Sequence, residues 1–141
     1  MPIDHVKIPC TDLDASRAFY STALAPFGYK LVYDGESSLG FGIGDGGDED
    51  EPFALELGEP PRARTHIAFT ADSAEQVDDF HAAALAAGGT DNGAPGERPY
   101  GAYYHAAFVL DPDVSNALVI TYRGRRGLST RARFANGASR R

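Results

Sequence analysis

Asp4-His5-Val6-Lys7-Ile8, near the start of the chain, has a counterpart in Thr65-His66-Ile67-Ala68-Phe69, 61 positions further on. The same offset, without a gap, aligns five further pairs: Phe19 with Phe80, Ala23 with Ala84, Leu24 with Leu85, Ala25 with Ala86 and Gly28 with Gly89. Self-similarity at a fixed offset is typical of a repeated supersecondary unit. Because the match includes a strand-like run, a histidine and a final glycine, it indicates two copies of one module.

Each copy has the pattern of a strand, a helix and then several strands. Short runs with alternating apolar residues predict the strands, which in the first copy are residues 5–9, 30–33, 39–43 and 53–57. Asp12 is a suitable N-cap for the helix that follows the first strand. Pro26 and Gly28 are expected to end that helix.

The second copy repeats this order. Ser73 and Gln76 have the spacing of a capping box, in which the two side chains satisfy free backbone amides at a helix start. Gly88 and Gly89 are expected to end the helix, and a turn at residues 111–113 separates the last two strands. The predicted strands of this copy are residues 66–69, 102–110 and 117–122.

These patterns predict an α+β protein of two tandem modules, each with a strand and a helix followed by further strands. The predicted boundaries are residues 1–58 for the first module, 59–64 for the linker, 65–122 for the second module and 123–141 for an arginine-rich C-terminal tail. The composition fits this interpretation, because 43% of the 141 residues are hydrophobic and such a chain can bury a core.

The composition also bears on where the protein works. No run approaches the roughly 18 to 20 apolar residues of a membrane-spanning helix, and no secretory signal is visible at the N-terminus. Cys10 is the single cysteine, so a disulfide framework is excluded. We therefore expect a cytoplasmic protein with no membrane partner.

The charge is distributed unevenly along the chain. Seven of the 13 basic residues are arginines of the tail, which has no acid, so the other 122 residues carry six basic groups against 20 acids, a net −14. An acidic body repels phosphates, and no recognition motif accompanies the arginines, so we expect no nucleic-acid partner. The tail is expected to lie on the acidic body, in solvent or against a second subunit of a homodimer.

Several motifs resemble one known family. They are Asp4-His5-Val6, Asp12-Leu13-x-x-Ser16-x-x-Phe19-Tyr20, residues 23–29 (Ala-Leu-Ala-Pro-Phe-Gly-Tyr), residues 80–89 with Asp91-Asn92-Gly93, and residues 107–113 (Ala-Phe-Val-Leu-Asp-Pro-Asp). Over residues 1–122 the chain is similar to the vicinal oxygen chelate superfamily, which includes glyoxalase, bleomycin-resistance and dioxygenase-like proteins. The resemblance implies a glyoxalase-like fold in which two tandem βαβββ modules curl eight strands into an open cleft.

The resemblance also implies a set of metal ligands. In metal-using members the first strand of each module gives a His or Gln, and the last strand of each gives a Glu. Carried over, His5, His66 and Glu56 match three of these ligands, while Leu118 stands at the fourth and Val114 replaces the glycine of the preceding turn. Two imidazoles and one carboxylate suit Zn, Fe, Ni or Mn, with coordination positions left open for a substrate.

A polar and aromatic segment follows in the second module. The resemblance implies that it lies by the cleft, with Arg98, Tyr100 and His105 binding substrate and Tyr103 acting with Glu56 as a catalytic residue. Arg98 is suited to pairing with a carboxylate. Tyr103 and His105 share one strand face and Tyr104 the other, so only one set can line the cleft. The alternative interpretation is a surface strand with ordinary aromatic packing.

Three functional hypotheses follow. The first is a divalent-metal-dependent lyase, isomerase or dioxygenase that acts on a small oxygenated molecule with a reduced ligand set. The second is a metal-free small-molecule binder, such as an antibiotic-resistance protein of the bleomycin-resistance type, whose acidic body would attract a cationic drug. The third is a homologue that keeps the fold after losing catalysis.

Overall fold

The computed structural model describes residues 3–44, 52–101, 103–114 and 116–124, so all but the first two residues of the predicted tail lie outside it. The first module contains β1 (Val6–Cys10), α1 (Leu13–Ala23), the short 3-10 helix η1 (Ala25–Phe27), β2 (Lys30–Asp34), β3 (Ser38–Gly42) and β4 (Phe53–Leu57). The second contains β5 (Thr65–Thr70), α2 (Ala74–Ala86), β6 (Thr90–Glu97), β7 (Tyr104–Leu110) and β8 (Asn116–Arg123).

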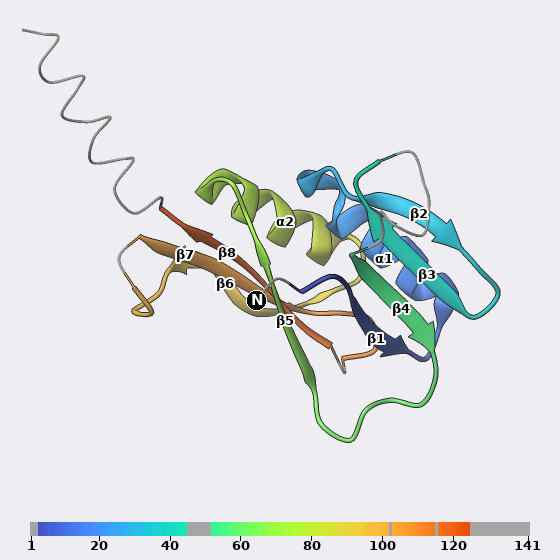
Figure 1. Cartoon of the computed structure of the whole chain (residues 1–141). Coiled ribbons are helices and arrows are strands. Elements are labelled where there is room, and N and C mark those ends of the chain that lie inside the picture. The colour runs from blue at the N-terminus through green and yellow to red at the C-terminus, as the bar shows by residue number, and fades with distance from the viewer. Residues whose placement is uncertain (1–2, 45–51, 102, 115, 125–141) are drawn as a thin grey trace, which may run out of the picture.

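The strands form two four-stranded sheets with the same topology (Figure 1). The order is β1-β4-β3-β2 in one sheet and β5-β8-β7-β6 in the other. In each sheet the strand that comes first in the chain runs parallel to the one that comes last, β1 beside β4 and β5 beside β8. The α+β class and the duplicated βαβββ architecture are thereby confirmed. The eight strands make two separate sheets, so the modules meet through side chains rather than through a shared ladder of hydrogen bonds.

The helix ends follow the predicted caps. The Asp12 carboxylate accepts a bond from the backbone N–H of Ala15, and the Ser73 hydroxyl accepts one from that of Gln76. The Gln76 side chain reaches back to the N–H of Asp72, at 2.8 Å, and so completes the capping box one residue further out than usual. Gly28, with φ of 76°, supplies the left-handed conformation that closes η1.

One continuous core joins the modules. Aromatic residues fill its centre, and the largest fully buried ones are Tyr20, Phe19, Phe41, Phe53 and Phe80. The helices cover one face of the sheets and contact each other, as Figure 1 shows. No helix of the described residues covers the other face of either sheet.

A buried polar network crosses the junction. The Tyr20 hydroxyl of α1 donates to Oδ2 of Asp111, and the Asn116 amide donates to the same oxygen and to the backbone carbonyl of Pro9. The other oxygen of Asp111, Oδ1, is buried without a partner among the described residues. Burial raises the pKa of the Asp111 carboxyl, against the hydrogen bonds from Asn116 and Tyr20 that lower it. The turn after β7 is thus bonded to α1 through Asp111, and the start of β8 is bonded to β1 through Asn116.

One strand of the second module was missed by the sequence patterns. β6 contains Gly93, Pro95 and Gly96, residues that normally indicate a turn, and its register with β7 shifts twice. Such residues are tolerated because β6 is the edge strand of its sheet and pairs with β7 alone. The predicted strand at 102–110 is also shorter in the structure, beginning at Tyr104.

Within the described residues, no helix has both the length and the apolar character needed to cross a bilayer.

Candidate functional site

Successive side chains of β5 and β8 point to opposite faces of the second sheet, and this alternation determines which of them share the helix-free face. Leu118 is fully buried in the core and pairs in register with Ile67. Its neighbours Ala117, which pairs with His66, and Val119, which pairs with Ala68, lie on the opposite face, the face of His66. The expectation that Leu118 occupies a ligand position of the cleft is therefore wrong, and the two residues of β8 that flank it on the His66 side, Ala117 and Val119, are equally apolar.

The three proposed metal ligands each have other surroundings. His5 is 63% exposed, and its Nδ1 lies 2.8 Å from the carboxylate of Asp4. Glu56 is exposed, and its Oε1 lies 3.9 Å from Nζ of Lys7. His66 is exposed on β5. No three His, Cys, Asp or Glu side chains of the described chain come together in a group able to hold a metal ion. In this arrangement the residues present do not fit a divalent ion.

Glu56 belongs instead to a shallow groove on the open face of the first sheet. The groove has a volume of about 210 Å³ and is lined by Lys7, Ile8, Pro9, Glu56, Leu57 and Gly58. The ammonium of Lys7 partly neutralises the carboxylate there, since the two are within ion-pair distance.

Two of the proposed substrate-binding residues lie on the open face of the second sheet. The Arg98 guanidinium donates to the carbonyls of Ala94 and Glu97, and its Cζ lies 5.4 Å from the centre of the Phe108 ring. Tyr100 is 66% exposed and meets the Tyr104 ring edge-on at 5.5 Å. Arg98 is thus held against its own strand and aromatic neighbour.

His105 and Tyr103 are placed elsewhere. Nε2 of His105 lies 3.1 Å from Oδ1 of Asp78 on α2, which puts His105 on the helix side of β7. Tyr103 precedes the strand, is exposed, and has a φ of 62°. The set with Tyr104 and Phe108 therefore takes the open face, and the structure does not bring Glu56, Tyr103 and His105 into one site.

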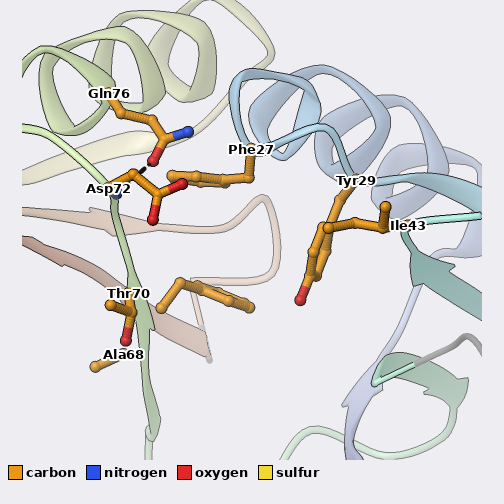
Figure 2. A pocket seen from close by; sticks show the side chains of 8 residues that line it. Phe27, Tyr29, Ile43, Ala68, Thr70, Asp72 and Gln76 are labelled. Carbon is orange, nitrogen blue, oxygen red and sulfur yellow. Dashed lines mark hydrogen bonds between the residues drawn. The ribbon is translucent and has the colours of Figure 1, made fainter.

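A larger cavity lies between the two modules (Figure 2), and none of the predicted site residues lines it. Its volume is about 390 Å³, within the usual range for small-molecule pockets. Its lining residues come from η1 and the ends of β2 and β3 on one side and from β5 and α2 on the other: Phe27, Tyr29, Ile43, Ala68, Phe69, Thr70, Asp72 and Gln76.

Two walls of the cavity are aromatic rings that pack against other aromatic rings of the core. Phe27 packs against Phe80 with ring centres 5.6 Å apart, and Phe69 meets Phe53 edge-on at 5.2 Å. Phe80 and Phe53 are buried in the core. Because close-packed core rings support them, the walls are preorganised for an apolar or aromatic ligand.

The polar groups of the cavity fall into two kinds. Both ends of the Gln76 amide are occupied, since its oxygen accepts from Asp72 N–H and its nitrogen donates to the carbonyl of Pro26 at 3.0 Å. The carboxylate of Asp72 and the hydroxyls of Tyr29 and Thr70 make no hydrogen bond or ion pair with the described residues. These three groups are available to a ligand.

One sequence signal could have pointed to this cavity. Ala68 and Thr70 follow His66 at alternate positions of β5 and so share its face, while Phe27 and Tyr29 belong to the motif at residues 23–29. The pairing of these two segments, however, depends on how the modules pack.

Known proteins agree with this architecture. A crystal structure of a glyoxalase/bleomycin resistance protein from Albidiferax ferrireducens is similar over 85% of this chain and 97% of that one, with 28% identity and a TM-score of 0.70. A glyoxalase/bleomycin resistance protein/dioxygenase family enzyme from Burkholderia phytofirmans has 23% identity over 86% and 98% of the two chains, with a TM-score of 0.64.

A third similar structure is the genomically encoded fosfomycin resistance protein FosX from Listeria monocytogenes. It has 20% identity over 89% of this chain and 95% of that one, with a TM-score of 0.64. The second and third likenesses establish the fold alone. No curated protein matches the chain.

The family model described as Glyoxalase/Bleomycin resistance protein/Dioxygenase superfamily matches residues 2–115, which include nearly all of the first module and most of the second. Together with the duplicated βαβββ architecture, this match shows that the chain belongs to the glyoxalase/bleomycin resistance protein/dioxygenase superfamily.

Proposed function

We propose that this protein binds a small organic molecule in the cavity between its modules and does so without a metal ion. The observation that carries the proposal is the 390 Å³ cavity, in which rigid aromatic walls face the polar groups of Tyr29, Thr70 and Asp72. A few convergent polar groups in an apolar concavity are the usual features of a small-molecule site. The function is that of a binding or sequestering protein.

The test uses benzyl alcohol as a neutral aromatic probe, because its ring suits the walls and its hydroxyl suits the free polar groups. Titration into isotope-labelled protein, followed by amide NMR, is expected to shift the signals of Ala68, Thr70 and Asp72. The shifts should be the same with and without EDTA. If the probe does not shift the amide signals of the cavity residues, or if EDTA abolishes the shifts, the proposal is wrong.

A metal-dependent lyase, isomerase or dioxygenase is the second candidate. It is favoured by the equivalent positions of His5 and His66 in the two modules and by the exposure of both imidazoles. It would require Glu56 to leave Lys7 and join both histidines, a rearrangement that costs the existing contact. The discriminating measurement is the metal content of protein purified without chelator, compared between wild type and His66→Ala. A stoichiometric Zn, Fe, Ni or Mn that is lost in the variant would favour the enzyme.

A homodimer is proposed from the charges, since the seven arginines of residues 123–141 complement a body with a net charge of −14. In sedimentation, the full chain is expected to behave as a dimer. A chain that ends at residue 122 is expected to form a dimer of lower affinity. The same monomer in both cases would refute the proposal. The cytoplasmic location stays a prediction, to be checked by cell fractionation.

A further inference from the structure

We propose that the ligand of the cavity between the modules is an organic cation: an apolar or aromatic body that carries an amine, with its ammonium group held by the carboxylate of Asp72. The inference rests on the proposed function, because it names the chemical class that the same cavity selects.

Among the described residues that line the cavity, Asp72 has the one charged side chain. Its carboxylate makes no hydrogen bond or ion pair with the described residues, although its own backbone N–H is bonded to Gln76. A carboxylate that faces an apolar concavity loses hydration when a ligand enters, and this cost is offset when the ligand brings a positive charge. A neutral or anionic ligand would leave the same charge unpaired.

The aromatic walls select for the same class. Phe27, Tyr29 and Phe69 all line the cavity, and Figure 2 shows Asp72 and Tyr29 on opposite sides of it. The face of an aromatic ring is negative and attracts ammonium groups, an attraction that strengthens when the cation is desolvated. An amine between these groups would contact a carboxylate and at least one ring at once.

Helix capping does not account for the Asp72 carboxylate. A negative charge just before a helix interacts favourably with the helix dipole. The N-cap of α2 is Ser73, however, and its hydroxyl, not the Asp72 carboxylate, accepts the N–H of Gln76. The carboxylate therefore remains available for a ligand.

The overall charge distribution also disfavours an anion. Residues 1–122 carry 20 acids and six basic groups, and no basic side chain of the described part of the chain lines this cavity. The resulting negative potential raises the local concentration of cations and lowers that of anions.

The experiment compares three probes of matched shape on the full chain: benzylamine, benzyl alcohol and benzoate, titrated by calorimetry at neutral pH. Benzylammonium is expected to bind about tenfold more tightly than benzyl alcohol, and benzoate more weakly than both. Asp72→Asn should lower the benzylammonium affinity to within about twofold of the alcohol and leave the alcohol unchanged. Added salt should weaken benzylammonium binding to the wild type but not to Asp72→Asn.

Glu75→Gln is the matched control. Glu75 is an exposed acid in the first turn of the same helix and does not line the cavity. Its substitution removes one negative charge from the same helix end and should leave all three affinities unchanged. A loss equal to that of Asp72→Asn would mean that the general potential, not the Asp72 carboxylate, attracts the amine, and would overturn the assignment.

The remaining outcomes separate this inference from the function on which it rests. Equal affinities for benzylammonium and benzyl alcohol, unchanged in Asp72→Asn, would overturn the cation inference and leave the cavity as a small-molecule site. Binding of none of the three probes would overturn the proposed function itself.

Tyr29→Leu gives a second variant, in which benzylammonium should lose about threefold more affinity than the alcohol. Equal losses for both probes would count against the aromatic contribution.

Discussion

Tyr20 and Asp111 are separated by 91 positions in the chain, yet the hydroxyl of Tyr20 donates a hydrogen bond of 2.7 Å to the carboxylate of Asp111. Both residues are fully buried, and the Asn116 amide donates to the same carboxylate oxygen. Because Tyr20 belongs to the first module and Asp111 and Asn116 to the second, this network connects the two halves of the protein.

Tyr20→Phe should destabilise the protein by about 1 to 3 kcal/mol, because it removes a donor from a buried carboxylate while keeping the ring. Urea denaturation of the wild type and the variant measures this loss. Tyr29→Phe is the control, since its hydroxyl has no partner among the described residues and its removal should cost less than about 0.5 kcal/mol. Equal losses in both variants would show that the bond to Asp111 contributes nothing specific.

Asp111→Asn should change the pH dependence of stability. Burial raises the pKa of the Asp111 carboxyl above its ordinary value of 3.8. The native state therefore binds this proton more tightly than the unfolded state, so the contribution is fully present below the unfolded pKa and is lost as pH rises through the folded pKa. The free energy of unfolding of the wild type minus that of Asp111→Asn should fall across this window and then level off.

Urea denaturation of both proteins at intervals from about pH 3 to about pH 8 gives this difference, in which the other titrating groups cancel. A difference that stays constant with pH would contradict the raised pKa. The same comparison can be made with Tyr20→Phe introduced into both proteins. This substitution removes a bond that lowers the pKa of Asp111, so the pH window in which the difference falls should move to higher pH.

Val114→Gly should stabilise the protein. Val114 has a φ of 61°, a left-handed conformation that is strained for a β-branched residue and free of strain for glycine. The backbone carbonyl of Val114 accepts a bond from Arg64, which glycine preserves. We expect a gain of about 1 kcal/mol in thermal or urea unfolding. Val114→Ala, which keeps a Cβ at this φ, should gain less, and an equal gain would locate the effect in the side chain and not in the backbone.

Ala68→Trp should fill the cavity between the modules. The larger side chain would occupy the space of the ligand, so binding of the aromatic probes should fall by about tenfold or more. Stability should change by less than about 1 kcal/mol, since Ala68 is exposed at the cavity wall. His66→Trp is the matched control, because His66 lies two residues earlier on the same face and does not line the cavity. Equal losses of binding would place the probe elsewhere on that face.

Most of the fold could be predicted from the sequence, because the caps and the periodicity are local signals and the repeat can be recognised by comparing the two halves of the sequence. The same signals failed at β6, where an edge position tolerates glycine and proline that a central strand would reject. Leu118 was given the wrong side because the turn before β8 determines its register, and a shift of one residue exchanges the two faces of a strand.

The site was harder to predict from the sequence, because it depends on contacts between residues that are far apart in the chain. Nothing local shows that Lys7 lies beside Glu56 or that Asp78 lies beside His105, and these contacts determine what the predicted residues do. The cavity has the same property, since Tyr29 and Asp72 face each other only after the modules have packed. Sequence spacing could place each residue on a strand or helix but could not bring the two segments together.

The irregular edge strand β6 has a consequence for how the protein behaves when crowded. A regular edge offers an unbroken row of backbone donors and acceptors on which another chain can add a strand, the first step toward fibrils. Pro95 removes one of those donors, and the two shifts of register in β6 interrupt the row. The outer edge of the second sheet is therefore a poor template for aggregation, although the same residues made this strand hard to recognise.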